Sequence, residues 1–308
     1  TTKATMGGVR GETDSEMCKD TVKNYLDRRS AINHRRVKCC NSSRSLYCPE
    51  CCALLVETNP PPISLPCKLD IVLDEKKRAK STGIHAKCLM GAQQRSEENT
   101  NSCALYDLER GDKLPNYNES AEGTYILFPL PGKSVPLASV ASDINRLVVL
   151  DCKWTKSSCK DRLELQNLPK VHLTNPPKES YFWRWHNEGP GMISTIEAIY
   201  YASLEVAEHK QSMSINQKET LIHLLYIFAE QRMSIQRSCQ ISGERPLPFS
   251  EKGKEEQRAL RRYKGTTKQA RDKEKGKLLN ENARKEREGT SKVTGISSLS
   301  QQVANIKM

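Results

Sequence analysis

The chain has 308 residues, of which 36% are hydrophobic and 28% charged, and its formal net charge is +12. This length can bury a substantial core, while the charged fraction predicts that part of the chain lies outside that core. The excess of Lys and Arg favours a polyanionic partner, with nucleic acid the first candidate, because basic side chains release counterions from a phosphate backbone. The longest apolar stretches are far shorter than the roughly 20 residues that span a bilayer, which excludes a membrane partner.

The N-terminal part of the sequence is polar and basic, and we assign residues 1–35 to a basic lead. The opening TTKATMGGVRGETDSE lacks the apolar region of a secretion signal, so we expect no export. The segment CKDTVKNYLDRRSAINHRRVKCC then has the pattern of a basic amphipathic helix that leads into a cysteine cluster. Five of the twelve cysteines fall between Cys39 and Cys52, and without an export signal this clustering favours metal ligands over disulfides.

The cysteine cluster predicts a small structural zinc knuckle over residues 36–58. Cys48 and Cys51 are separated by two residues, a spacing that lets both thiolates reach one tetrahedral zinc, and Cys40 lies eight residues earlier. A four-cysteine knuckle would place its first thiolate at Val37. The candidates for the fourth ligand are therefore Cys39, Cys52 and His34. The alternative interpretation is a set of reduced, partly buried thiols.

Residues 60–242 have the pattern of one α/β domain. After the extended TNPPPISLP linker, strands are predicted at CKLDIVLD (67–74), TYILFPLP (124–131) and INRLVVLD (144–151), the last as an interior strand of a parallel sheet. Helices are predicted at STIEAIYYASLEVAEHK (194–210) and QKETLIHLLYIFAEQRM (217–233). The apolar face of the second consists of Leu221, Leu224, Leu225 and Phe228. Strands that alternate with helices indicate the α/β class.

The C-terminal part, residues 243–308, is predicted to be a largely disordered basic tail. Between Glu251 and Glu288 there are fourteen Lys or Arg and eight Asp or Glu, a net charge of +6 with almost no apolar periodicity. We interpret the tail as a nonspecific nucleic-acid arm. Together with the run KKRAK (76–80), it resembles a nuclear localisation signal, so we expect a nuclear protein, with a cytoplasmic location as the alternative.

The segment YFWRWHNEGPGMISTIEAIYYAS carries the strongest functional pattern. Aromatic residues alternate with cations, which suits stacking on bases and contact with carboxylate or phosphate, although each aromatic side chain is also a candidate core residue. Ser194 and Glu197 then have the S-x-x-E spacing of a capping box at a helix start. Helix starts also bind anions, but the cap is the interpretation that these residues favour.

Five blocks together resemble the DTW-domain tRNA-uridine aminocarboxypropyltransferases, with the eukaryotic type-1 enzymes the most similar. The blocks, in chain order, are RSLYCPEC, KSTGIHAK (80–87), LFPLPGKS (127–134), VVLDCKW (148–154) and FWRWHNEGPGMISTIEAIYY (182–201). The resemblance implies a SPOUT-like α/β sheet with a knotted C-terminal region. It also implies transfer of the 3-amino-3-carboxypropyl group of S-adenosylmethionine to N3 of a D-loop uridine in tRNA, with release of methylthioadenosine.

The resemblance and this chemistry together suggest roles for the matched residues. Asp151 at a strand end is the expected base for the N3 proton, Trp154 an apolar or stacking wall, and Arg184 a clamp for the substrate carboxylate. The residues expected around S-adenosylmethionine are Phe128, Pro129, Gly132, Ser194, Thr195 and Glu197. The residues expected on the tRNA side are Lys80, Ser81, Thr82, His85 and Trp183. A single histidine such as His85 is otherwise more often a structural residue.

One departure from the family pattern falls inside the central motif. The family reads Asp-x-Thr-Trp, whereas this chain has Lys153 at the Thr position, and Leu130 stands where the FPxP loop has a small residue. A long cation in place of a small hydroxyl gives a second reading, a catalytically weakened or silent RNA-binding member of the same fold. A third reading, a zinc-containing DNA-binding regulator with a basic tail, leaves the 182–201 block unexplained.

Overall fold

The computed structural model describes nine segments of the chain and two further residues. These are residues 21–26, 46–56, 60–93, 103–117, 122–152, 162–177, 180–182, 192–210 and 213–242, together with Glu255 and Ala259. The chain divides into two compact units, residues 1–249 and residues 250–308. The predicted basic tail therefore falls almost wholly outside the described residues, and of the predicted N-terminal helix only 21–26 is described, as helix.

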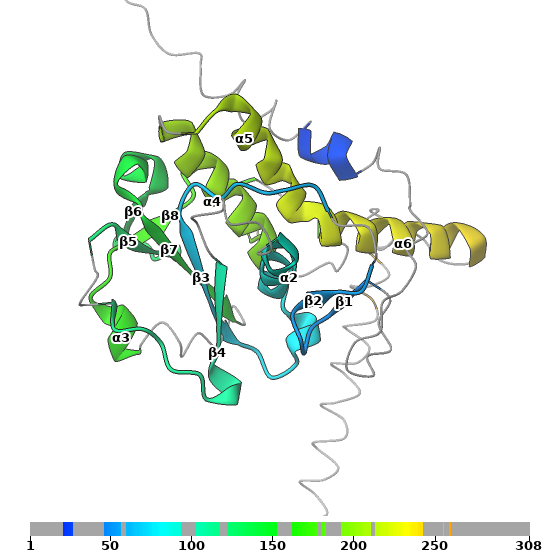
Figure 1. The fold of residues 1–308 in the computed structure, drawn as a ribbon, viewed down its shortest axis with the longest axis horizontal. Coiled ribbons are helices and arrows are strands. Elements are labelled where there is room, and N and C mark those ends of the chain that lie inside the picture. Colours follow the sequence, from blue (N-terminus) through cyan, green and yellow to red (C-terminus); the bar gives the residue numbers. More distant parts are fainter. Residues whose placement is uncertain are drawn as a thin grey trace, which may run out of the picture. The chain divides into compact units, whose positions relative to one another are not determined.

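A six-stranded parallel sheet forms the centre of the first unit (Figure 1). In sheet order its strands are β4 (Cys103–Asp107), β3 (Lys68–Asp74), β7 (Arg146–Cys152), β5 (Thr124–Leu127), β8 (Lys170–His172) and β6 (Ser134–Pro136). The predicted α/β class is confirmed, and the three predicted strands are present as β3, β5 and β7. Three more strands were not predicted, because β4, β6 and β8 have only three to five residues and their side chains show no strong alternation.

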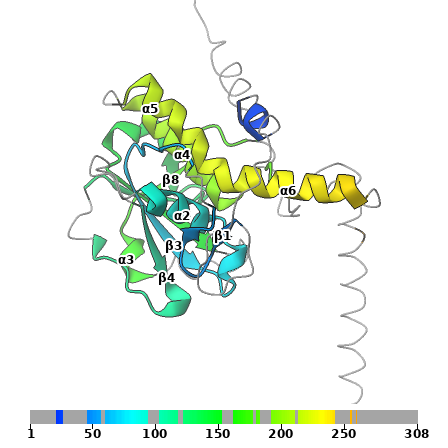
Figure 2. The ribbon, with the colours of Figure 1, turned by 45° about the vertical axis from the view of Figure 1, so that its right-hand side comes forward.

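Both faces of the sheet are covered, as expected for parallel strands. Alternate residues of β7 face opposite sides, so Leu147 and Val149 belong to the larger apolar cluster and Val148 to the smaller one. The helices that contribute to the larger cluster are α2 (Gly83–Gln93), α4 (Thr195–His209) and α6 (Tyr226–Ser242), with the short helix η7 (Leu221–Leu225). Helix α3 (Leu163–Gln166) contributes to the smaller cluster, and Figure 2 shows it apart from the other helices.

The two helices predicted from periodicity are both present, the second in a divided form. Helix α4 begins one residue after the predicted capping residue Ser194. The second predicted helix corresponds to α5 (Ile215–Thr220), η7 and α6 in succession. The prediction of a single continuous helix there was therefore wrong. The predicted apolar face is nevertheless buried: Leu221, Leu224, Leu225 and Phe228 are each 0% exposed. The tighter η7 turn keeps these side chains in the core while the axis changes.

A small antiparallel hairpin precedes the sheet. It consists of β1 (Tyr47–Cys48) and β2 (Ala53–Leu54), joined by a turn at residues 49–52; we call Cys48 and this turn together the Cys turn. Cys52 has a left-handed backbone conformation there, with φ 51°. The predicted SPOUT-like knot and zinc knuckle remain predictions.

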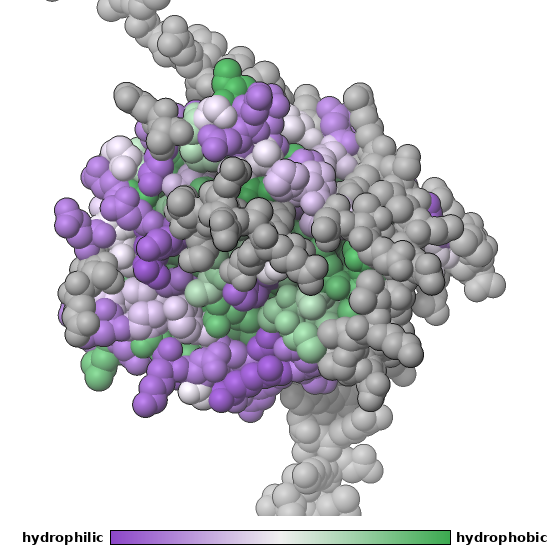
Figure 3. Space-filling model, in the orientation of Figure 1, coloured by the Kyte–Doolittle hydropathy of each residue, from purple (hydrophilic) through white to green (hydrophobic). Residues whose placement is uncertain are grey.

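All strands of the central sheet point the same way, so their carboxyl ends lie along one edge. In Figure 1 this edge faces downward, and Figure 3 shows hydrophilic residues gathered along the lower border of the same face. Polar side chains at this edge include the exposed Lys76, Lys77 and Lys80. Among the described residues, no helix is long and apolar enough to cross a membrane.

Candidate active site at the carboxyl edge of the sheet

Asp151 lies near the end of β7, in the middle of the sheet. Strand pairing places it opposite Leu73 of β3, and its side chain is 7% exposed. In parallel α/β sheets, ligands bind beyond the carboxyl ends of the strands. The prediction that Asp151 stands at a strand end is therefore correct. Asp151 is the acidic residue of β7, and it is buried.

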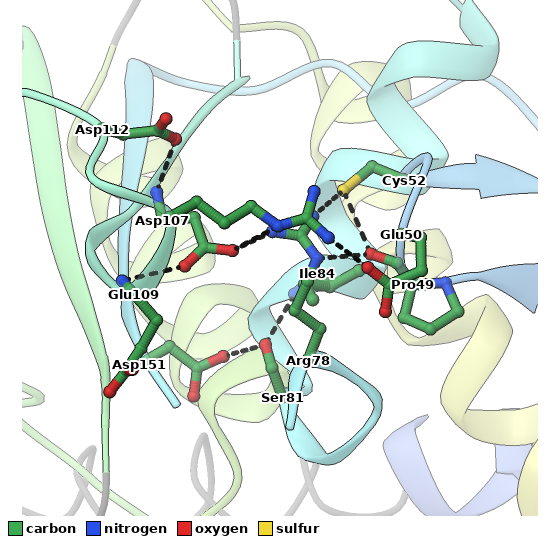
Figure 4. A network of polar contacts seen from close by, with 11 residues as sticks. Pro49, Glu50, Cys52, Arg78, Ser81, Ile84, Asp107, Glu109, Asp112 and Asp151 are labelled. Atoms are coloured by element: carbon green, nitrogen blue, oxygen red, sulfur yellow. Dashed lines mark hydrogen bonds and ion pairs between the residues drawn. The ribbon is translucent and has the colours of Figure 1, made fainter. Parts of the chain in front are cut away.

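Three donors from two different helix starts surround the Asp151 carboxylate. Oδ2 accepts hydrogen bonds from the Ser81 hydroxyl (Figure 4) and from the Gly83 N–H, the latter at 2.8 Å. Oδ1 accepts from the Thr195 hydroxyl at 2.7 Å. Ser81 and Gly83 stand at the start of α2, whereas Thr195 is the first residue of α4. The carboxylate thus joins the amino-terminal ends of two helices, where the positive ends of the helix dipoles favour a negative charge.

Gly83 is required for this close approach. An ideal Cβ on residue 83 would lie 2.6 Å from Asp151 Oδ2 and 3.1 Å from Ile71 Cγ2. Contacts under 3.0 Å force a displacement, so any larger residue moves the carboxylate, the helix start or both. The glycine of the KSTG block is therefore explained by a backbone that must pass against Asp151.

The two helix starts also contact each other directly. The Thr82 hydroxyl oxygen accepts a hydrogen bond from the Ile196 N–H at 3.2 Å, which satisfies one of the free N–H groups of α4. Burial raises the pKa of the Asp151 carboxyl above its ordinary value, and the hydrogen bonds from Ser81, Thr195 and Gly83 offset part of that rise. A carboxyl with a raised pKa exchanges protons more readily near neutral pH than an exposed one.

Ser194 and Glu197 form the predicted capping box of α4. Glu197 is 1% exposed, and its carboxylate accepts from the Ser194 N–H and from the Ser194 and Ser180 hydroxyls. It also accepts from the Tyr181 N–H at 2.7 Å. Four donors from the protein surround this carboxylate, so the geometry favours the capping interpretation. Its predicted contact with the substrate ammonium stays a prediction.

The loop predicted to border the adenosine begins beside Asp151. Pairing of Leu127 with Val149 places the end of β5 next to the end of β7. Phe128 is half-buried, Pro129 is exposed, and Gly132 is exposed with φ 69° and open space around it. The hydroxyl of Ser134 closes the turn by donating to Leu130 O at 3.0 Å and accepting from Leu130 N. The loop thus presents backbone at the same edge as Asp151.

The residues predicted on the tRNA side divide into two groups. Lys80 is exposed, and its contact with a tRNA phosphate stays a prediction. Ser81, Thr82 and His85 are 3%, 7% and 1% exposed, and the first two bind the Asp151 site and α4 as described. His85 lies edge-on against the Tyr47 ring, with the ring centroids 4.9 Å apart. Its burial favours the structural interpretation and offers no surface to a phosphate.

Arg78 is a residue of this region that sequence reasoning missed. Its guanidinium donates to Pro49 O at 2.7 Å and to the Asp107 carboxylate, and it lies 3.0 Å from Cys52 Sγ (Figure 4). The local sequence KKRAK suggests a surface run of cations, yet Arg78 is 8% exposed. The signal in the sequence that could have identified Arg78 is its position just before the KSTG block.

The Cys turn contains part of the predicted zinc site. The Cys51 N–H donates to Cys48 Sγ at 3.4 Å. The hydrogen bond from Cys88, and then the Arg78 guanidinium, lower the pKa of Cys52 to about 6, whereas burial raises the pKa of Cys88. Within the described segments, no three potential ligands gather into a metal site. The chemistry of the Cys48 and Cys51 donors fits zinc, and they would supply two of its ligands.

Several predicted residues lie outside the described segments. They are Trp154, Arg184, Trp183, Lys153, Cys39 and Cys40. Their assigned roles stay predictions. The described residues of four different sequence blocks, which contain Ser81, Gly132, Asp151 and Thr195, nevertheless meet along one edge of the sheet.

Comparison with known proteins gives a match to a protein family. The DTW domain family model matches residues 45–233, well over half of the chain. No curated protein and no solved structure matches the chain. The matched region includes the Cys turn, every strand of the central sheet, both helix starts at Asp151 and the first eight residues of α6. DTW domains are associated with tRNA-modifying transferases, and their substrate is tRNA. On this match the chain belongs to the DTW domain family.

Proposed function

We propose that this protein transfers the 3-amino-3-carboxypropyl group from S-adenosylmethionine to N3 of a D-loop uridine in tRNA. The observation that carries the proposal is the Asp151 carboxylate, which is buried at the carboxyl edge of the sheet and held by Ser81, Gly83 and Thr195. These residues belong to three separate blocks of the family resemblance. Such convergence of distant residues on one carboxylate is typical of a functional site.

The reaction needs a base and a leaving group. A C–N bond forms between uridine N3 and the carbon next to the sulfonium, the C–S bond breaks, methylthioadenosine leaves, and the N3 proton is lost. A carboxylate has about four acceptor positions, and three of those on Asp151 are occupied by protein donors. The remaining position on Oδ1 is the one that we assign to the N3 proton.

The edge of the sheet suits S-adenosylmethionine. This co-substrate supplies the activated aminocarboxypropyl group. The exposed loop of Phe128, Pro129 and Gly132 offers backbone for contact with the adenosine. At the start of α4 the Ile196 N–H is bonded to Thr82 and the Glu197 N–H to Ser194, so we assign contact with the substrate carboxylate to the Thr195 N–H. Arg184 would add a bidentate clamp on that carboxylate.

The second candidate is a weakened or silent RNA-binding member of the family. The observation that favours it is Lys153, which replaces the Thr of the Asp-x-Thr-Trp motif. Lys153→Thr separates the two candidates. In an enzyme this change alters the turnover measurably, whereas in a protein that only binds RNA the transfer activity is zero before and after it.

The decisive test is analysis of tRNA nucleosides by mass spectrometry from cells with and without the gene, followed by transfer assays with purified protein. Aminocarboxypropyl-uridine should disappear without the gene and return with the wild-type chain. Asp151→Asn should abolish transfer and keep tRNA affinity, while Asp143→Asn, a change at an exposed acid, should leave both transfer and tRNA affinity unchanged. Normal levels of the modified nucleoside in cells without the gene would rule out the proposal.

Nuclear localisation and the structural zinc belong to the proposal as well. The localisation rests on the basic tail, because Arg78 in the middle of the KKRAK run is buried. Fluorescence microscopy of the tagged full chain, with and without residues 243–308, tests it directly.

A further inference from the structure

Arg78 ties three segments of the chain together beside the Asp151 site (Figure 4). Its Nε donates to the backbone carbonyl of Pro49, one terminal nitrogen donates to the Asp107 carboxylate, and the other lies 3.0 Å from Cys52 Sγ. A planar guanidinium satisfies several acceptors at fixed angles, which an ammonium does not. The three contacts therefore join the Cys turn, the end of β4 and the short helix η1 (Arg78–Lys80) in one geometry.

Helix η1 leads directly from Arg78 to the Asp151 site. The Ser81 N–H donates to Arg78 O at 3.0 Å. The Ser81 hydroxyl donates to Asp151, and its oxygen also accepts from the Ile84 N–H at 3.2 Å. At that end of η1 the Lys77 N–H makes an exposed hydrogen bond of 3.1 Å to Glu75 Oε1, whereas the Arg78 side chain is the buried anchor.

Asp107 is a fixed partner for this anchor. Its side chain is 3% exposed, and its Oδ1 accepts from the Glu109 N–H at 3.1 Å. The Asp107 N–H in turn donates to Asp112 Oδ2 at 2.8 Å. Because Oδ1 and the backbone of Asp107 are held, the end of β4 sets the position of Arg78. Without the guanidinium, the buried carboxylate keeps only the longer contact of 3.4 Å between Oδ2 and Arg110 Nε among the cations of the described residues.

We propose that Arg78 is a positioning residue for the Asp151 site. It holds η1 against the end of β4 and the Cys turn, so that Ser81 and Gly83 meet the carboxylate and α2 begins at the right place. The role in turnover rests on the proposed transferase function, whereas the role in ordering the start of α2 does not.

A matched control exists at the opposite end of the same sheet. Arg146, the first residue of β7, pairs with Asp70 of β3 at 2.6 Å, and the Asp70 carboxylate also accepts from the Tyr117 hydroxyl at 3.0 Å. The carboxylate of this pair is as buried as that of the Arg78–Asp107 pair, because the Asp70 and Asp107 side chains are each 3% exposed. The Arg146–Asp70 pair stabilises the sheet without contacting Asp151, α2 or the Cys turn.

The test compares Arg78→Lys, Arg78→Met and Asp107→Asn with Arg146→Lys in the full chain. We expect the Arg78 and Asp107 variants and the Arg146 control all to lower the thermal midpoint. Only the Arg78 and Asp107 variants should lower kcat, by about tenfold or more, with little change in KM for tRNA, because a small displacement of a reacting group has effects of this order. They should also move the acidic limb of the pH profile. If Arg146→Lys lowers kcat as much at an equal loss of thermal midpoint, the proposal is wrong.

Amide hydrogen exchange provides a readout that does not depend on transfer activity. In Arg78→Lys the N–H groups of residues 81–88 should exchange faster relative to those of residues 226–233 of α6, while Arg146→Lys should leave this ratio unchanged. Unchanged exchange at 81–88 in both Arg78 variants overturns the positioning role even in an active protein. If residues 81–88 exchange faster in Arg78→Lys than in the wild type, and the wild type has no transfer activity, the positioning role is supported and the proposed reaction is rejected.

Discussion

Thr195, the first residue of α4, donates a hydrogen bond of 2.7 Å to the carboxylate of Asp151, which lies 44 residues earlier at the end of β7. This bond joins two blocks of the sequence that share no local structure. Thr195→Val should lower the transfer rate about tenfold or more, because a hydrogen bond to a charged group contributes about 1.5–3 kcal/mol. Thr195→Ser, which keeps the hydroxyl, should stay close to wild type. Steady-state transfer assays with both variants test this, and equal activities would show that the bond has no role in turnover.

Gly83 and Gly91 lie on the same helix and give a paired prediction. Gly83→Ala places a methyl 2.6 Å from Asp151 Oδ2, so the carboxylate must shift, and transfer should fall sharply. Gly91→Ala has Cys52 O as its nearest neighbour at 3.8 Å, an ordinary contact, and should be neutral or raise the free energy of unfolding by up to about 1 kcal/mol. Thermal unfolding and transfer assays check both, and a fully active Gly83→Ala would show that the carboxylate tolerates the displacement.

The raised pKa of Asp151 predicts the shape of the pH profile. The base must be ionised, so kcat should rise with pH through the pKa of this carboxyl, which burial places above its ordinary value. The Ser81 hydrogen bond favours the ionised form. Ser81→Ala should therefore raise the pKa further and move the acidic limb to higher pH. Ser139→Ala, an exposed serine away from the site, is the control. A limb that stays in place or moves to lower pH in Ser81→Ala would assign the base to another group.

Zinc content is a separate prediction from the Cys turn. Purified protein should contain about one zinc per chain by elemental analysis, and Cys51→Ser should lose it together with part of the stability, because metal binding and folding are coupled. Cys103→Ala is the matched control, since the Cys103 thiol is buried in β4 and burial raises its pKa to about 12. If purified wild-type protein contains no metal, the prediction of a zinc knuckle is wrong and these residues form a cluster of thiols.

The basic tail gives a prediction about salt. Deletion of residues 245–308 should weaken tRNA binding and make it less dependent on salt, because each cation that neutralises a phosphate adds about 0.9 to the slope of log K against log salt. Replacement of the tail by an uncharged linker of equal length should give the same slope as the deletion. Binding isotherms at several salt concentrations measure it, and an identical slope with and without the tail would exclude the tail from binding.

Local sequence patterns were sufficient for the α/β class, for three strands of the sheet and for the start of α4. Alternation and apolar runs predicted β3, β5 and β7, and the S-x-x-E spacing predicted the cap of α4. Helix α2 was missed as a helix, because its two glycines and polar residues obscure the helical period. The split of the second helix into α5, η7 and α6 was missed because the same apolar spacing suits both a continuous and a divided helix.

The sequence by itself determined which residue types stand at the strand end, at the two helix starts and in the cysteine cluster. Only the tertiary structure decided that Ser81, Asp151 and Thr195 meet, and that Arg78 faces inward to Asp107. The physical reason is the separation along the sequence of the residues that interact. Strand and helix patterns depend on neighbours within a few residues, whereas these contacts join residues 29 to 70 positions apart. They depend on the strand order β4-β3-β7-β5, which brings the carboxyl ends of distant segments to one edge.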